Sequence, residues 1–135
     1  MGSGLGFGSD SGSSTQTDEQ TNIKHCSTLS TFRELLNTQT PVIVNVSTSW
    51  CHFCRKIEPI FNNLSHEYDS KILFIKVNGD NGREIVQEYG VTSYPTFISF
   101  HQGEILQRVV GADESQLRQC IQQLLELTPK LHFLP

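Results

Sequence analysis

The stretch that decides the fold is NVSTSWCHFCRKIEPIF, which runs from residue 45 to residue 61. It contains two cysteines, Cys51 and Cys54, separated by two residues. Apolar residues follow the second cysteine at helical spacing, which predicts a helix from Cys54 to about Tyr68. The run before the cysteines, PVIVNV at 41–46, is apolar and rich in β-branched residues, as in a strand buried on both faces. The cysteine pair is therefore expected where a buried strand leads into a helix.

Similar patterns continue on both sides of this stretch. Strands are expected at 22–26, 41–46, 71–77, 96–100 and 104–111, and helices at 31–37, 54–68, 83–90 and 113–127. Ser27 or Ser30 would cap the first helix, and Asp113 would cap the last. Alternating β and α units predict parallel strand pairs with helices on both faces, and the closing hairpin adds antiparallel pairs. We therefore expect an α/β fold with a central mixed sheet of about five strands, flanked by about four helices.

The composition indicates one folded domain between two tails. The length of 135 residues suits a single domain. Residues 1–20 hold five of the ten glycines and three acidic residues, with no Lys or Arg, and are predicted to be a flexible polar tail. The folded domain is expected at 21–128, and a short C-terminal tail at 129–135.

The charge and hydropathy patterns exclude some classes of partner. No apolar run approaches the roughly 18 residues that a membrane-spanning helix needs. The net charge is −4, and the Lys and Arg residues are scattered, so neither nucleic acid nor an anionic membrane is expected as a partner. We expect the chain to act as a monomer.

The N-terminal segment predicts a location. It lacks the basic start and apolar core of a secretory signal, and it is not Arg-rich like a mitochondrial presequence. The expected location is therefore the cytoplasm, with the nucleus as the other possibility. Both compartments are reducing, which argues against two permanent disulfides among the four cysteines.

Three interpretations of the cysteine pair compete. A zinc site needs four ligands, usually two close pairs, whereas Cys26 and Cys120 stand apart from this single C-x-x-C. A pair of inert buried thiols fits poorly, because the end of a buried strand lies at the sheet edge where ligands bind. Cys26 and Cys120 are expected to be packed core residues, and Cys120 would lie on the apolar face of the last helix.

The third interpretation is a redox pair, and physical chemistry favours it. The first turn of a helix stabilises an anion through its free N–H groups and macrodipole, so a thiolate on Cys51 would be stabilised. The thiolate is the form that attacks a disulfide. Cys54 would lie one turn further on, close enough to form a small disulfide ring. A C-x-x-C beside a βαβ pattern is a recognised indication of this chemistry.

Four stretches together resemble the thioredoxin family. They are VIVNVSTSWCHFCRKIEPIF, LFIKVN, YGVTSYPTFISFHQGE and VVGA, and the likeness extends over about residues 21–127. The specific features are W-C-x-x-C, a proline five residues after the second cysteine, a later Pro-Thr before a strand, and a Gly-Ala near the end. The resemblance implies a thioredoxin fold.

The resemblance also implies roles for individual residues. Cys51 would be the nucleophile and Cys54 the resolving thiol. Pro95 matches the family's cis-proline, which faces the cysteines and offers the backbone of the preceding residue to a bound peptide. The residues that would border the substrate groove are Trp50, Tyr94 and Gly111. Without this context, Trp50 would be interpreted as a packed core aromatic and Pro95 as an ordinary proline at a strand start.

The activity implied is the reduction of protein disulfides, with no metal and no organic cofactor beyond the Cys51–Cys54 disulfide. The expected partners are disulfide-containing proteins and a recycling reductase or dithiol, such as thioredoxin reductase or glutathione. Two alternatives stay open. One is a disulfide oxidase or isomerase, and the other is a binding module with little turnover.

The sequence departs from the family at three places. His52 and Phe53 stand between the cysteines instead of Gly-Pro; a protonated His52 would stabilise the thiolate, whereas an exposed one would have little effect. Asn45 stands where thioredoxins have a buried Asp, and an amide cannot titrate. Lys76 matches the lysine beside that acid; without its partner it is expected to point to solvent. The residue before Pro95 is Tyr94, as in disulfide isomerase domains.

Overall fold

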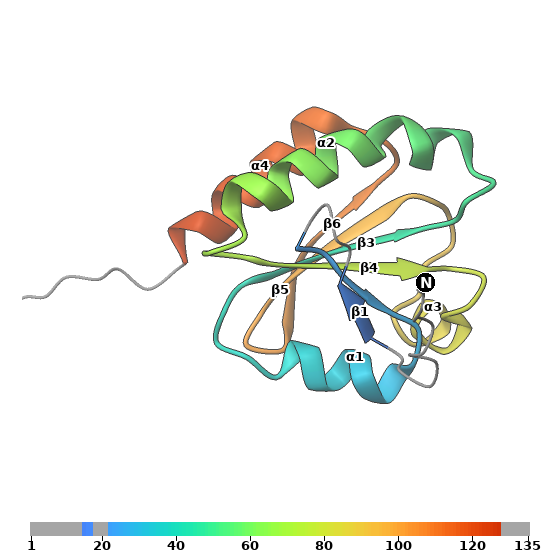
Figure 1. Cartoon of the computed structure of the whole chain (residues 1–135), viewed down its shortest axis with the longest axis horizontal. Coiled ribbons are helices and arrows are strands. Elements are labelled where there is room, and N and C mark those ends of the chain that lie inside the picture. Colours follow the sequence, from blue (N-terminus) through green and yellow to red (C-terminus); the bar gives the residue numbers. More distant parts are fainter. Residues whose placement is uncertain (1–14, 18–21, 128–135) are drawn as a thin grey trace, which may run out of the picture.

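The computed structural model describes residues 15–17 and 22–127. A six-stranded sheet lies between two pairs of helices, with α2 and α4 on one face and α1 and α3 on the other (Figure 1). The strands are β1 (Thr15–Thr17), β2 (Lys24–Cys26), β3 (Val42–Ser47), β4 (Leu73–Asn78), β5 (Thr96–His101) and β6 (Glu104–Val110). The helices are α1 (Leu29–Leu36), α2 (His52–Tyr68), α3 (Arg83–Glu88) and α4 (Glu114–Glu126).

The sheet is mixed, as the sequence predicts, and its strand order is β1-β2-β4-β3-β5-β6. β3 lies near the middle, parallel to β4 and antiparallel to β5. All six residues of β3 are buried, which explains why its sequence is nearly continuously apolar. Because β3 is held on both sides, its carboxyl end is a fixed point from which the cysteine loop starts.

The strand β1 lies within residues 1–20, which were expected to be a flexible polar tail. Thr15–Thr17 pairs antiparallel with β2, in the register Thr15 to Cys26. The pairing covers the outer edge of β2, whose backbone groups would otherwise lack partners on that side. The composition does not indicate this strand, because pairing between strands uses backbone N–H and C=O groups and requires no particular side chains. The expected boundaries of the domain otherwise stay a prediction.

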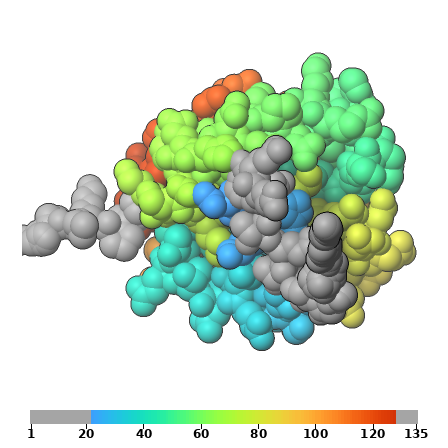
Figure 2. Space-filling view, in the orientation of Figure 1, coloured from blue at the N-terminus to red at the C-terminus, as the bar shows by residue number. Residues whose placement is uncertain are grey.

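The core has two layers, one on each face of the sheet. Side chains of β3 alternate between them, so that Ile43 packs with α2 and α4 while Val44 packs with the α1 and α3 layer. Cys120 belongs to the first layer and Cys26 to the second, and burial raises the pKa of both thiols. Both lie buried in the core, as expected. In the space-filling view, the atoms of α2 (green) lie at the top of the molecule and those of α1 (cyan) at the bottom (Figure 2).

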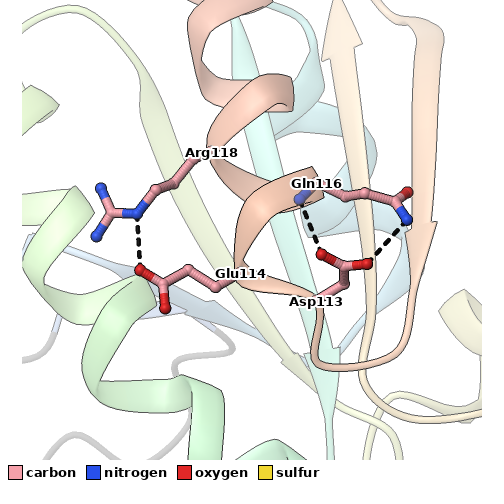
Figure 3. A network of polar contacts seen from close by, with 4 residues as sticks. All are labelled: Asp113, Glu114, Gln116 and Arg118. Atoms are coloured by element: carbon pink, nitrogen blue, oxygen red, sulfur yellow. Dashed lines mark hydrogen bonds and ion pairs between the residues drawn. The ribbon is translucent and has the colours of Figure 1, made fainter.

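The cap of α4 is the predicted residue, and the cap of α1 is a different one. Asp113 caps α4, because its carboxylate accepts the backbone N–H of Gln116 at 3.0 Å; the amide of Gln116 donates to the other carboxylate oxygen (Figure 3). The first helix is capped by Thr28, not by Ser27 or Ser30. Its backbone is extended, which lets the hydroxyl accept the N–H of Thr31 at 3.3 Å.

In the part of the chain that the structure describes, no helix is both long and apolar enough to cross a membrane.

Candidate active site

The two cysteines lie where β3 leads into α2, as predicted. Cys51 is the N-cap of α2, and its Sγ accepts a hydrogen bond from the backbone N–H of Cys54 at 3.2 Å. This N–H is one of the helix's free donors, and the helix dipole points its positive end at the same sulfur. The start of α2 therefore directs a backbone donor and the positive end of its dipole at the Cys51 sulfur.

The second cysteine is the more protected one. Both are free thiols, with 8% of Cys51 and 4% of Cys54 exposed. Burial, together with the neighbouring Cys51 sulfur, raises the pKa of Cys54 to about 12. Cys54 therefore keeps its proton, and Cys51 is the slightly more exposed of two buried residues. This asymmetry suits an outer sulfur that attacks and an inner one that acts second.

The loops around Pro95 and Gly111 meet the cysteines. The peptide bond between Tyr94 and Pro95 is cis, as the resemblance implied. The carbonyl oxygen of Tyr94 lies 3.6 Å from Sγ of Cys51 and accepts its hydrogen bond. The carbonyl of Pro95 accepts the backbone N–H of Gly111 at 2.8 Å, and Gly111 has a φ of 99°, which favours glycine. Three residues predicted to line a groove are thus brought beside the first cysteine.

Trp50 is not a packed core aromatic. Its side chain is 64% exposed, and its indole N–H donates to the carboxylate of Asp80 at 3.0 Å. Its ring meets the ring of Tyr94 edge-on, with the centroids 6.1 Å apart. A Cβ on Gly79 would lie 2.5 Å from the ring of Tyr94, so only glycine leaves room for that ring. The turn GDNG thus supports the site, a role that its sequence did not indicate.

The two residues between the cysteines face outward. Phe53 is 59% exposed, and His52 is also exposed. Their rings meet edge-on, with the centroids 5.6 Å apart. They add exposed aromatic surface next to Cys51 in the chain.

Asn45 and Lys76 are register partners on β3 and β4, under α2. Asn45 is 1% exposed, and its Oδ1 has no hydrogen-bond partner among the described residues. Lys76 does not point to solvent without a partner, so that expectation was wrong. Its Nζ forms an ion pair with Oε2 of Glu58, which α2 supplies from the position four residues after Cys54. That helical spacing is the signal that could have found Glu58.

A small pocket of about 210 Å³ joins Cys54 to this ion pair. It is lined by Ser47, Thr48, Ser49, Cys54, Arg55, Glu58, Lys76 and Asn78. Cys54 therefore has polar and charged neighbours on one side.

A metal site lacks a ligand set here. Across residues 15–17 and 22–127, no three His, Cys, Asp or Glu side chains form a group that could hold a metal ion.

Comparison with known proteins decides the family, because residues 23–123 match the thioredoxin family model. The chain belongs to the thioredoxin family. A thioredoxin of Pyropia yezoensis is 38% identical over 80 residues, which cover 59% of this chain and 75% of the relative. Thioredoxin H1 of Arabidopsis thaliana is 33% identical over 107 residues, covering 76% of this chain and 93% of the relative.

Solved thioredoxins also share the fold. The structure of a Malassezia sympodialis thioredoxin superposes with a TM-score of 0.73 at 32% identity, covering 76% of this chain and 93% of that one. Thioredoxins are disulfide reductases, and this thioredoxin-family chain is a thiol-disulfide oxidoreductase whose cysteine pair is Cys51 and Cys54. The geometry around the pair agrees with that chemistry.

Proposed function

We propose that the chain reduces disulfide bonds in other proteins, with Cys51 as the attacking group. The observation that carries this proposal is the position of the Cys51 sulfur. It caps α2, accepts the N–H of Cys54 and lies against the carbonyl of Tyr94. In the first step, the Cys51 thiolate attacks one sulfur of a substrate disulfide. A bond forms between Cys51 and that sulfur, and the other substrate sulfur leaves as a thiolate.

Cys54 completes the reaction in the second step. It loses its proton and attacks the sulfur of Cys51, which releases the remaining substrate sulfur as a thiolate. The substrate has then gained two electrons, and the protein holds a Cys51–Cys54 disulfide. The backbone distance between positions 51 and 54, within one helical turn, allows this small ring to close.

The groove around Cys51 supplies the substrate contacts in this proposal. Trp50 and Phe53 offer exposed aromatic surface, and an extended peptide would run beside the backbone of Tyr94, whose carbonyl contacts Cys51. Gly111 leaves space beside Pro95, since nothing lies within 4 Å of where its Cβ would be. A disulfide in an extended or locally unfolded segment would fit such an open site.

A reductant must return the two electrons. The proposed donors are a thioredoxin reductase or a small dithiol or thiol such as glutathione. These steps use only the two sulfurs, and neither a metal nor an organic cofactor takes part in them. We keep the cytoplasm as the proposed location because a reducing compartment would hold the pair as a dithiol.

Reduction of insulin in the presence of dithiothreitol tests the proposal. The wild-type chain should accelerate the precipitation of the insulin B chain, and Cys51→Ser should abolish the effect. Cys26→Ala is the matched control, because it removes a buried thiol on β2 without touching the site. A Cys51→Ser variant as active as the wild type would overturn the proposal.

The reverse electron flow is a second candidate, favoured by Asn45. Its buried amide leaves this position without a titratable group. A disulfide oxidase needs less help in deprotonating Cys54, because its resting state is the disulfide. Equilibration of the pair with glutathione distinguishes the two: a strongly reducing pair supports the reductase, and a pair that stays reduced in mildly oxidising glutathione supports the oxidase.

A further inference from the structure

The second chemical step leaves one proton unassigned. Cys54 must lose its proton to become a nucleophile, and burial has raised the pKa of Cys54 to about 12. Water at neutral pH removes such a proton slowly. A nearby base would speed the step, typically by roughly 10²–10⁴-fold where it is well positioned.

Asn45 is not that base. Its side chain is buried under α2 next to the strand position of Lys76, but an amide does not accept a proton from a thiol. The base must therefore come from the residues that line the pocket beside Cys54.

The pocket offers a single candidate among the described residues that line it. Its charged side chains are Arg55, Glu58 and Lys76, and its other lining groups are hydroxyls, an amide and the Cys54 thiol. Arg55 and Lys76 are cations and cannot take up a proton, and Arg55 is also occupied in donating to the carbonyl of Ser49 at 2.9 Å. Only the carboxylate of Glu58 can accept one.

The position of Glu58 fits this task. It follows Cys54 by four residues on α2, so the two side chains lie on the same face with their Cβ atoms about 5–6 Å apart. Lys76 reaches across from β4 and holds the carboxylate through an ion pair. The charge of Lys76 also acts on Cys54, whose pKa it lowers in part. Lys76 thus acts on both Glu58 and Cys54.

The pocket can also hold the water that would connect them. Its volume is about 210 Å³, well above the roughly 10–15 Å³ that is enough to hold one water. Thr48 lines it, and the buried hydroxyl of Thr48 has no hydrogen-bond partner among the described residues. A polar, roomy site with an available hydroxyl is one that water occupies.

We propose that Glu58, held by Lys76, accepts the proton of Cys54 through water in this pocket when Cys54 resolves the mixed disulfide. This inference rests on the proposed function. The proton moves from Sγ of Cys54 to the Glu58 carboxylate, and the Cys54 sulfur bonds to the Cys51 sulfur. The bond from Cys51 to the substrate sulfur breaks, and the electron pair leaves with the substrate thiolate. Glu58 then returns its proton to solvent, since its side chain is 41% exposed.

Stopped-flow reaction with Ellman's reagent separates the two steps. Attack by Cys51 releases one thionitrobenzoate ion, and resolution by Cys54 releases a second. Glu58→Gln should slow the second release about tenfold or more at pH 7, with the first changed less than twofold. The difference in second-release rate between the wild type and Glu58→Gln should decrease as pH rises toward the pKa of Cys54, because the Cys54 thiolate then forms without a base. Glu58→Asp should recover part of the rate at neutral pH.

Glu67→Gln is the matched control, because it neutralises another exposed carboxylate of the same helix, more than three turns away from Cys54. Its second release should equal that of the wild type. The same second-release rate and pH profile in Glu58→Gln and wild type would overturn the inference. A wild-type chain that releases only one thionitrobenzoate would instead refute the proposed function, so the two failures are distinguishable. Glu58→Gln loses a half-exposed ion pair, which contributes little to folding.

Discussion

The backbone N–H of Gly111 donates to the carbonyl oxygen of Pro95 at 2.8 Å, and this bond joins the loop after β6 to the loop before β5. The two loops meet beside Cys51, whose sulfur contacts the carbonyl of Tyr94. The groove proposed for the substrate thus includes a backbone contact that a φ of 99° at Gly111 permits.

Replacing Gly111 by Ala should therefore affect both stability and activity. A non-glycine residue at this φ is strained by about 1–3 kcal/mol, although the Cβ itself would meet open space. We expect a similar loss in the free energy of unfolding in urea, together with slower insulin reduction. Gly103→Ala is the matched control, since Gly103 has a φ of 83° in the β5–β6 hairpin, away from the cysteines. It should lose stability but retain activity per folded molecule; equal activity losses in both variants would contradict the argument.

Gly79→Ala should displace the ring of Tyr94. The new Cβ would lie 2.5 Å from ring atoms, and overpacking of this kind costs about 1–3 kcal/mol. Trp50 is the single tryptophan, and it contacts this ring, so its fluorescence should change in the variant. In a Tyr94→Ala background the same glycine substitution should cost less. A full stability loss in both backgrounds would show that another contact requires Gly79.

Trp50→Ala should reduce activity without much loss of stability. The side chain is 64% exposed, so truncation should change the free energy of unfolding by about 0.5 kcal/mol or less. If Trp50 contributes about 1–2 kcal/mol to substrate binding, kcat/KM for insulin should fall about 5- to 30-fold. Ile105→Ala, on an exposed part of β6, gives a comparison that should leave kcat/KM unchanged. Equal effects of the two substitutions on kcat/KM would show that Trp50 does not contribute to substrate binding.

The raised pKa of Cys54 predicts a pH dependence of stability. In the folded chain the pKa is about 12, whereas an unfolded thiol titrates near 9. Between these values the unfolded chain binds fewer protons at this position than the folded one, so stability falls as pH rises. Urea unfolding at pH 8 and at pH 10.5 should show a larger loss for the wild type than for Cys54→Ser. Parallel losses in the two proteins would show that the other titrating groups explain the trend.

Much of the fold could be predicted from the sequence because the deciding patterns are local. The buried run of β3, the helical spacing after Cys54 and the cap at Asp113 each depend on residues close together in the chain. Thr28 was missed as a cap because three neighbouring hydroxyl residues could serve equally, and only the backbone conformation selects one. The strand Thr15–Thr17 was missed because its partner lies in β2, and pairing rests on backbone groups.

The site residues that belong to a short motif could be predicted from the sequence. The contacts between residues from different elements could not. Cys51 and Cys54 follow from spacing. The ion pair of Lys76 with Glu58 joins β4 to α2, and the hydrogen bond of Trp50 to Asp80 joins two loops. Such long-range partners depend on the packing of whole elements. The monomeric state and the cytoplasmic or nuclear location stay predictions.

The pairing of β1 with β2 has a consequence for handling the molecule in solution. With Thr15–Thr17 in place, β2 is no longer an outer strand, and β6 is the edge on the other side. A version shortened to begin after residue 17 would present bare backbone donors and acceptors along β2. Light scattering should then report larger particles as the protein concentration rises. Residues 15–17 would in that case protect β2 from pairing with another copy of the chain.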